Sequence, residues 1–285
     1  MQTLKNKIKA YIRLTRFDKP TGLFLLLWPT LWALWLAAHG MPPFHILCIF
    51  VAGVIVMRPA GCIINDFADR HFDKQVVRTQ DRPLATGEVK VWEAVILFVL
   101  LCGIGLILVL QLNLLTISLA VLALIVSSLY PFTKRFLSVP QLILGLGWYL
   151  AIPMAFAAVL DRVPLLGWLT YIAVVIWTLI FDTMYGLADK EDDAKVGIKS
   201  AALLFGKYVR FNLAVLQGIF LALLLIIGML VQLSWFYYVA WTTALILSIY
   251  QQYLIKDFNP DSCISAFKNN HWLGLVMYFG IVFSI

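Results

Sequence analysis

The chain has 285 residues, of which 62% are hydrophobic and 13% are charged, and its net charge is +7. Soluble domains are about 45–50% apolar and about 25% charged, so this composition excludes an ordinary soluble protein. The apolar runs are continuous over roughly 20 residues, which favours membrane-spanning helices over the alternating strands of a β-barrel. The four cysteines are scattered, and their spacing indicates neither a zinc site nor a disulfide framework. We therefore expect an all-α, polytopic membrane protein.

Nine apolar stretches are expected to cross the bilayer, each of them long enough for about 30 Å of hydrocarbon and the last one only just. In chain order they are 21–38, 46–66, 92–111, 113–130, 140–160, 166–187, 211–231, 235–255 and 271–285. We expect a single transmembrane domain over residues 1–285.

Positive charge lies almost entirely on one side of the predicted membrane. Every lysine and arginine except Arg58 and Arg162 falls there, in the N-terminal segment and the loops 67–91, 131–139, 188–210 and 256–270. Because basic loops stay in the cytoplasm, we expect the N-terminus and these loops to be cytoplasmic and the C-terminus to lie on the opposite side. The net charge therefore indicates orientation in a membrane and does not point to nucleic-acid binding.

Two acidic motifs stand at the ends of the second and sixth predicted spans. The first contains Asn65, Asp66, Asp69 and Asp73, and the second contains Tyr185, Asp189 and Asp193. A shift of 120 residues superposes Asn65 on Tyr185, Asp69 on Asp189 and Asp73 on Asp193. This match predicts a weak internal repeat in which spans 1–4 correspond to spans 5–8. Four spans separate the copies, so both motifs should emerge on the same face of the membrane.

The two motifs together predict a site for a metal ion and a diphosphate. Residues four apart share one face of a helix, so the two ends should direct the carboxylates of Asp69, Asp73, Asp189 and Asp193 into one space. Carboxylates this close repel one another unless a cation neutralises them, and oxygen ligands suit Mg²⁺. Asn65 and Asp66 complete the candidate metal ligands. Basic side chains, which suit a diphosphate, are expected on the same face: Arg78, Arg82, Lys134, Arg135, Lys195 and Lys199.

Three further residues have two interpretations each. Arg58 lies inside an apolar span, where a charge is costly, so it either pairs with an acidic residue or holds an anionic substrate. Asp182 lies similarly deep in the sixth span, where it either accepts a proton from a reacting group or pairs with Arg58. Tyr130 lies one turn before Lys134 and either faces the substrate or anchors the span at the membrane interface.

These motifs resemble a known family. Asn65-Asp66-x-x-Asp69-x-x-x-Asp73, followed by Arg82-Pro83-Leu84, looks like the first signature of the UbiA superfamily of intramembrane aromatic prenyltransferases. Tyr185-x-x-x-Asp189-x-x-x-Asp193, followed by Gly197-Ile198-Lys199-Ser200, resembles the second signature. Asp18-Lys19-Pro20, the Leu27–Trp35 segment, Pro153–Ala158 and Asn269-Asn270 resemble the branch that prenylates 4-hydroxybenzoate in ubiquinone synthesis.

The resemblance implies nine helices around a central cavity with a cytoplasmic cap, in the inner membrane of a bacterium. It implies Mg²⁺-dependent transfer of a polyprenyl group from its diphosphate to the ring carbon ortho to the hydroxyl of 4-hydroxybenzoate. Asn65, Asp69, Asp73, Asp189 and Asp193 would then hold Mg²⁺–diphosphate. Diphosphate contacts would come from Arg82, Tyr130, Lys134 and Lys199, and the aromatic carboxylate would bind Arg58 or Arg135.

Two alternatives remain open from the sequence. A different branch of the superfamily would share the Asp motifs and use another aromatic acceptor. A cation-coupled transporter would also carry repeats and buried carboxylates, but these would lie near the membrane midplane. The predicted position of the motifs at helix ends, beside basic residues, favours the enzyme.

Overall fold

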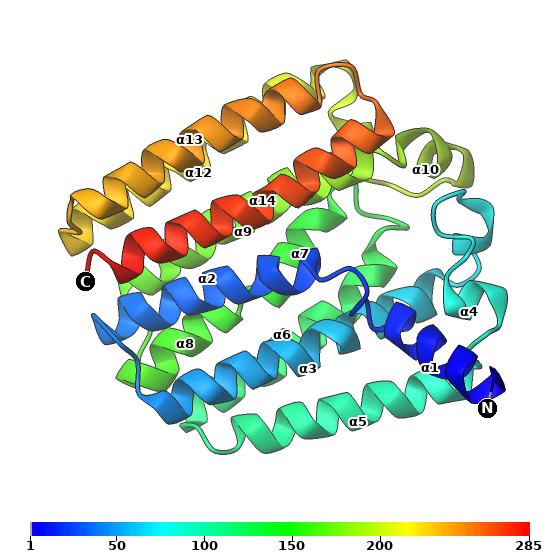
Figure 1. Cartoon of the computed structure of the whole chain (residues 1–285), viewed down its shortest axis with the longest axis horizontal. Helices are drawn as coiled ribbons and strands as arrows, with labels where there is room; N and C mark the ends of the chain where they lie inside the picture. Colours follow the sequence, from blue (N-terminus) through cyan, green and yellow to red (C-terminus); the bar gives the residue numbers. More distant parts are fainter. Residues whose placement is uncertain (1) are drawn as a thin grey trace.

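The computed structural model describes residues 2–285, and over this range the chain folds into helices without a β-strand. The α-helices are α1 (Gln2–Leu14), α2 (Thr21–Ala38), α3 (Phe44–Asp69), α4 (Pro83–Thr86), α5 (Val91–Val109), α6 (Leu114–Thr133), α7 (Pro140–Trp148), α8 (Ala151–Leu160), α9 (Leu165–Leu187), α10 (Lys190–Val196), α11 (Ala201–Leu204), α12 (Val209–Val231), α13 (Trp235–Leu254) and α14 (Pro260–Val282). Two short 3₁₀ helices complete the chain, η1 (Asp73–Gln75) and η2 (Gly206–Tyr208). The long helices run side by side along one axis (Figure 1).

Seven helical segments in the described residues are long and apolar enough to cross a membrane: Thr21–Ala38, Phe44–Asp69, Val91–Val109, Leu114–Thr133, Pro140–Leu160, Leu165–Leu187 and Gly206–Val231. They match the first seven predicted spans, so the protein is an integral membrane protein. The last two predicted spans are helical as α13 and α14, but both helices are less apolar. Helix α14 begins at Pro260, well before the predicted start at 271, because Asn259 caps its N-terminus.

The fifth predicted span is broken into α7 and α8 at Tyr149 and Leu150. Pro153 explains the break, because a proline has no amide hydrogen to donate to the carbonyl four residues earlier, which here belongs to Tyr149. That carbonyl instead accepts a hydrogen bond from the amide of Ile152 at 2.9 Å. The break keeps Trp148, the last residue of α7, beside the cavity described below.

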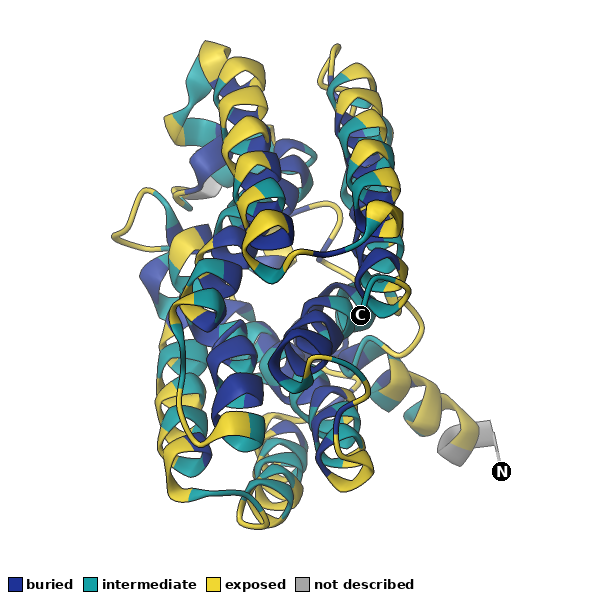
Figure 2. Cartoon of the chain, turned by 90° about the vertical axis from the view of Figure 1, so that its left-hand side faces the viewer, coloured by how far each residue is buried: buried dark blue, intermediate teal, exposed yellow. Residues whose placement is uncertain are grey.

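Aromatic side chains hold the middle of the bundle together. Trp32 of α2 is buried, stacks on Trp177 of α9 with ring centroids 5.6 Å apart, and donates its indole N–H to the carbonyl of Gly274 in α14. Trp177 in turn donates to the buried Oδ1 of Asn270 at 2.8 Å. Figure 2 shows that buried residues concentrate in the inner helices and exposed ones on the periphery. The outer helix α5 buries only Ala94 and leaves most of its apolar surface exposed, as expected for a helix against lipid.

The short helices α1, α4 and α10 gather at one end of the bundle (Figure 1). Helix α1 docks there through two ion pairs, one between Lys7 and Glu93 at 2.7 Å and one between Arg13 and Glu88. Leu14, the last residue of α1, is fully buried. We refer to this end of the bundle, which carries both acidic motifs, as the loop end.

A cavity of about 220 Å³ runs along α3 from Ile49 to Ile64 and is also lined by α2, α5, α6, α7 and α8. Its wall is almost entirely apolar, with Arg58 as its charged side chain. The lining residues Leu106 of α5 and Val121 of α6 are also 52% and 51% exposed. We infer from these exposures that the cavity opens between α5 and α6, and its lining along α3 includes Ile64, the residue before Asn65 in the sequence.

Candidate active site

The first acidic motif straddles a helix end. Asn65 and Asp69 lie on one face of α3, and the ammonium of Lys134 joins them, 2.8 Å from Oδ1 of Asn65 and 2.6 Å from Oδ2 of Asp69. The expectation that Asp73 continues this face is wrong, because α3 ends at Asp69 and Asp73 begins the separate helix η1. Instead, Arg82 donates hydrogen bonds to both carboxylate oxygens of Asp73, each at 2.9 Å.

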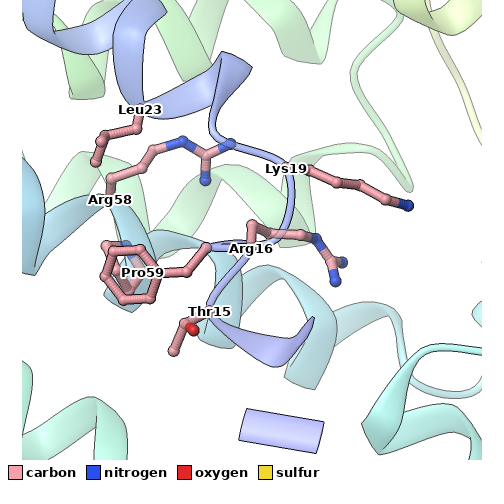
Figure 3. A pocket seen from close by; sticks show the side chains of 7 residues that line it. Thr15, Arg16, Lys19, Leu23, Arg58 and Pro59 are labelled. Carbon is pink, nitrogen blue, oxygen red and sulfur yellow. The ribbon is translucent and has the colours of Figure 1, made fainter. Parts of the chain in front are cut away.

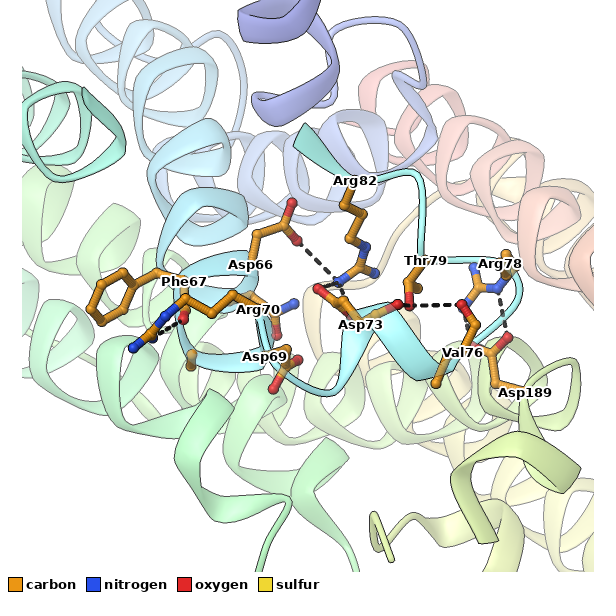
Figure 4. A network of polar contacts seen from close by, with 12 residues as sticks. Asp66, Phe67, Asp69, Arg70, Asp73, Val76, Arg78, Thr79, Arg82 and Asp189 are labelled. Carbon is orange, nitrogen blue, oxygen red and sulfur yellow. Dashed lines mark hydrogen bonds and ion pairs between the residues drawn. The ribbon is translucent and has the colours of Figure 1, made fainter. Parts of the chain in front are cut away.

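The second motif is also divided between two helices rather than lying on one. Tyr185 belongs to α9, Asp189 stands at the N-terminal cap of α10, and Asp193 lies in α10. Arg78 connects the two motifs, because it follows the first motif in sequence and pairs with Asp189, its Nε 2.6 Å from Oδ1. Its guanidinium also lies 3.9 Å from the centroid of the Tyr185 ring. Figure 4 shows this bridge from the loop after α3 to the start of α10.

Asp66 faces a different set of partners from the other aspartates. Its carboxylate is buried and accepts two hydrogen bonds from Arg16, at 2.8 and 2.9 Å, and lies 3.1 Å from Arg82. The sequence predicts no specific role for Arg16, which is one of several basic residues in the N-terminal segment. Nothing in the local pattern signals the pair, because the partners are separated by 50 residues.

Asp193 makes no ion pair with any other described residue. Its pKa is raised to about 7, first because burial removes water from the carboxylate and then because the negative charges of Asp189 and Asp69 are near. The pKa of Asp73 is raised to about 6, because burial outweighs the attraction of Arg82. A cation among these groups would relieve the accumulated negative charge.

The donor set fits Mg²⁺, because Asn65 and the aspartates offer oxygen ligands only. In the part of the chain that the structure describes, however, no three acidic, histidine or cysteine side chains stand close enough to chelate one ion. Lys134, Arg82 and Arg78 each hold an aspartate that would otherwise be available. Lysine and arginine side chains are also the donors that a diphosphate would require.

The remaining basic candidates, Arg135, Lys199 and Lys195, make different contacts. Arg135 donates to the carbonyl of Ala68 at 3.2 Å and so supports the end of α3. Lys199 donates to the carbonyl of Phe136 at 3.1 Å, and its own amide donates to the carbonyl of Lys134 at 3.0 Å. Lys195 is not brought to the cluster, because its exposed side chain pairs with Asp192.

Arg58 lies between two hollows and has no carboxylate partner among the described residues. Its guanidinium lies 4.5 Å from the ring centroid of Trp148, contacts the thiol of Cys62, and leaves a buried Nε without a hydrogen bond. On one side it lines the apolar cavity, and on the other a small pocket below the α1–α2 connection with Arg16 and Lys19 (Figure 3). The expected pair with Asp182 is absent, so the interpretation as an anion-binding residue remains.

Tyr130 is buried rather than exposed at a membrane interface, and the ammonium of Lys134 lies 5.1 Å from its ring centroid. Its position favours a role beside the cluster over the interface anchor. Asp182 is half-buried in α9, one turn before Tyr185 of the second motif.

Fold and site together define a class: an integral membrane protein with an apolar cavity among its helices and an acidic and basic cluster at the loop end. The chain belongs to the UbiA prenyltransferase family, whose model matches residues 26–275. It is 51% identical to a 4-hydroxybenzoate octaprenyltransferase of Coxiella burnetii over 284 residues, which cover 100% of this chain and 99% of the relative.

Solved structures agree with this assignment. A UbiA homologue from Aeropyrum pernix K1 superposes with a TM-score of 0.79 at 25% identity and covers 92% of this chain and 97% of its own. A UbiA homologue from Archaeoglobus fulgidus, bound to GPP and Mg²⁺, superposes with a TM-score of 0.72 and covers 96% and 99% of the two chains. At 19% identity the second likeness shows the shared fold alone.

Proposed function

We propose that the protein transfers a polyprenyl group from polyprenyl diphosphate to the ring carbon ortho to the hydroxyl of 4-hydroxybenzoate, in ubiquinone biosynthesis. The observation that carries the proposal is the position of Arg58. Among the described residues it has no carboxylate partner, and it lines an apolar cavity whose wall includes Ile64, the residue before Asn65. A cavity of this kind fits a prenyl chain, and an arginine fits an aromatic carboxylate. The activity named for the relative from Coxiella burnetii agrees with both.

We assign the metal to the two motifs. Asn65, Asp69, Asp73, Asp189 and Asp193 would hold Mg²⁺, and the bound ion would neutralise the diphosphate and favour its departure. Asp66, which is paired with two arginines, is the least available of the candidate ligands. The remaining acidic residues lie at the loop end, from which a diphosphate could reach the cavity.

The basic residues act on the leaving group. Arg78, Arg82 and Lys134 would donate hydrogen bonds to the diphosphate oxygens as negative charge develops on them. The apolar wall of the cavity keeps water from the allylic carbon after its bond to oxygen breaks. The electron-rich ring carbon of 4-hydroxybenzoate then attacks this allylic carbon. Arg58 or Arg135 would orient the acceptor by binding its carboxylate.

Two groups are placed to take the proton that leaves the ring, the released diphosphate and Asp182. Asp182 could instead assist by deprotonating the phenol. The variant Asp182→Asn distinguishes Asp182 from the diphosphate as the base, because removing a base that acts in the chemical step lowers kcat. An unchanged kcat would assign the proton to the diphosphate.

We further propose that α13 and α14 also cross the membrane, which makes nine spans. The N-terminus and loop end would face the cytoplasm, as a cap over the cavity, and the C-terminus would face the other side of a bacterial inner membrane. The distribution of lysine and arginine supports this orientation. Alkaline phosphatase fused to the C-terminus should be active in cells, whereas a fluorescent protein that folds only in the cytoplasm should be dark.

The activity is tested with purified protein, octaprenyl diphosphate and 4-hydroxybenzoate, with and without a metal chelator. A prenylated acid should form only when Mg²⁺ is present, and mass spectrometry should place the prenyl group ortho to the hydroxyl. Other aromatic acceptors, supplied in parallel, test the other branches of the family. Solute flux into liposomes without any prenylated product would contradict the proposal.

A further inference from the structure

A buried chain of alternating charges connects the end of helix α1 to the first acidic motif. Arg16 binds both oxygens of Asp66, Asp66 lies 3.1 Å from Arg82, and Arg82 binds both oxygens of Asp73. Figure 4 shows Arg82 between the two carboxylates. The two guanidinium groups and the two carboxylates of this row of four side chains have no net charge together.

Asp66 is the residue that most needs a partner. It is completely buried, and a buried carboxylate without a positive neighbour is strongly unfavourable. Arg16 and Arg82 are its two charged partners among the described residues. If Arg16 were absent, Asp66 would depend on Arg82 alone.

Arg82 has a second task in the proposed reaction. It would move from Asp73 to the diphosphate when the substrate and metal arrive. An Asp66 without another cation would hold Arg82 back, because breaking a buried ion pair leaves an uncompensated charge. The neutral four-residue chain avoids this competition.

The backbone at Arg16 is arranged for this contact. Its φ of 60° lies in the left-handed region, which is unusual for a residue other than glycine and is found where surrounding structure enforces it. The other guanidinium nitrogen of Arg16 donates to the carbonyl of Arg13 at 2.9 Å, which closes the turn at the end of α1. The turn directs the side chain inward, although Phe17 and Lys19 beside it are exposed.

We propose that Arg16 is a positioning residue for the diphosphate: it neutralises Asp66, so that Arg82 is free to bind the substrate. Arg16 itself does not touch the diphosphate. The proposal rests on the proposed function only in that the anionic substrate is a prenyl diphosphate.

The test uses Arg16→Ala, Asp66→Asn and the double variant in the full-length protein. Arg16→Ala should raise the KM for prenyl diphosphate by about tenfold or more, with little change in the KM for 4-hydroxybenzoate or in kcat. The Kd of an unreactive prenyl thiodiphosphate should rise by the same factor. Adding Asp66→Asn to Arg16→Ala should restore both constants to within about threefold of the wild type, because the competing carboxylate is gone.

Arg13→Ala is the matched control, because it removes the arginine three residues earlier, whose ion-pair partner is Glu88 and not a residue of the acidic motifs. It should leave both constants unchanged. If Arg13→Ala matches Arg16→Ala, docking of α1 as a whole is responsible and the proposal is wrong. The proposal is also wrong if the double variant binds the diphosphate no better than Arg16→Ala.

Should Arg16→Ala fail to accumulate in membranes, the comparison moves to the Asp66→Asn background. There the loss of Arg16 should have no effect on binding of the thiodiphosphate, and a tenfold loss would overturn the proposal. Binding of the thiodiphosphate needs no acceptor. A protein that binds it tightly but fails to prenylate 4-hydroxybenzoate would therefore refute the proposed function and still decide the role of Arg16.

Discussion

Replacing Arg58 by methionine should weaken binding of the aromatic acid without harming the fold. A hydrogen bond to a charged group contributes about 1.5–3 kcal/mol, and about 1.4 kcal/mol corresponds to a factor of ten. The KM for 4-hydroxybenzoate should therefore rise by about 10- to 150-fold. The KM for the prenyl diphosphate should change far less, because Arg78, Arg82 and Lys134 remain.

Two comparisons make this prediction specific. The methyl ester of the acceptor has no carboxylate, so Arg58→Met should use the ester as well as the wild type does. Gly22→Ala should also raise the KM for 4-hydroxybenzoate, although Gly22 does not line the cavity. A new Cβ at Gly22 would lie 2.9 Å from Cζ of Arg58 and displace the guanidinium. Thermal unfolding in detergent should show Arg58→Met no less stable than the wild type, since the buried Nε already lacks a partner.

Initial rates with each substrate varied in turn, and the other saturating, decide the result. If the KM for the prenyl diphosphate rises more than that for the acid, Arg58 belongs to the diphosphate site. If the ester loses as much activity as the acid, Arg58 acts through packing rather than through charge.

Three further predictions test the metal site and the cavity. Asp69→Ala and Asp189→Ala should each abolish turnover, because either loss unbalances the charge around the metal; near-normal rates in both would remove these residues from the site. Asp193 must lose its proton to bind a cation, and its pKa is about 7. The Mg²⁺ concentration that gives half-maximal activity should therefore decrease as the pH rises from about 6 to about 8. Asp193→Asn should make this concentration less dependent on pH. Gly53 lines the cavity and faces open space, so Gly53→Trp should lower activity with long prenyl donors more than with short ones. Gly103→Trp, on the exposed side of α5, should affect long and short donors about equally. Equal losses with both donors in Gly53→Trp would exclude Gly53 from the path of the prenyl chain.

The membrane-spanning helices could be predicted from the sequence because they depend on local composition. Continuous apolar runs gave the first seven spans, whose ends agree with the structure to within a few residues. The break at Tyr149 was missed, although Pro153 is a local signal for it. The 120-residue repeat stays a prediction, but the two motifs it relates do lie at the same end of the bundle.

The contacts within the site were less predictable, because they join segments that are distant in sequence. Helical periodicity placed Asp73 on the face of Asp69, but the chain leaves the helix between them. The pairing of Asp66 with Arg16 depends on how α1 docks, and no spacing indicates it. Residue type alone also suggested Lys195 as a diphosphate contact, although its position on α10 points it toward solvent.

The opening of the cavity between α5 and α6 has a consequence for how the enzyme's rate should be measured. A donor that enters through this opening is delivered by diffusion within the lipid, so its surface density in the bilayer governs encounter, rather than its amount per volume of buffer. Adding empty lipid to a fixed amount of enzyme and donor should therefore slow the reaction by dilution in two dimensions, while the dependence on the water-soluble acid stays the same. The prenylated product is at least as apolar as the donor and should leave by the same opening, so it should remain in the membrane that holds the enzyme.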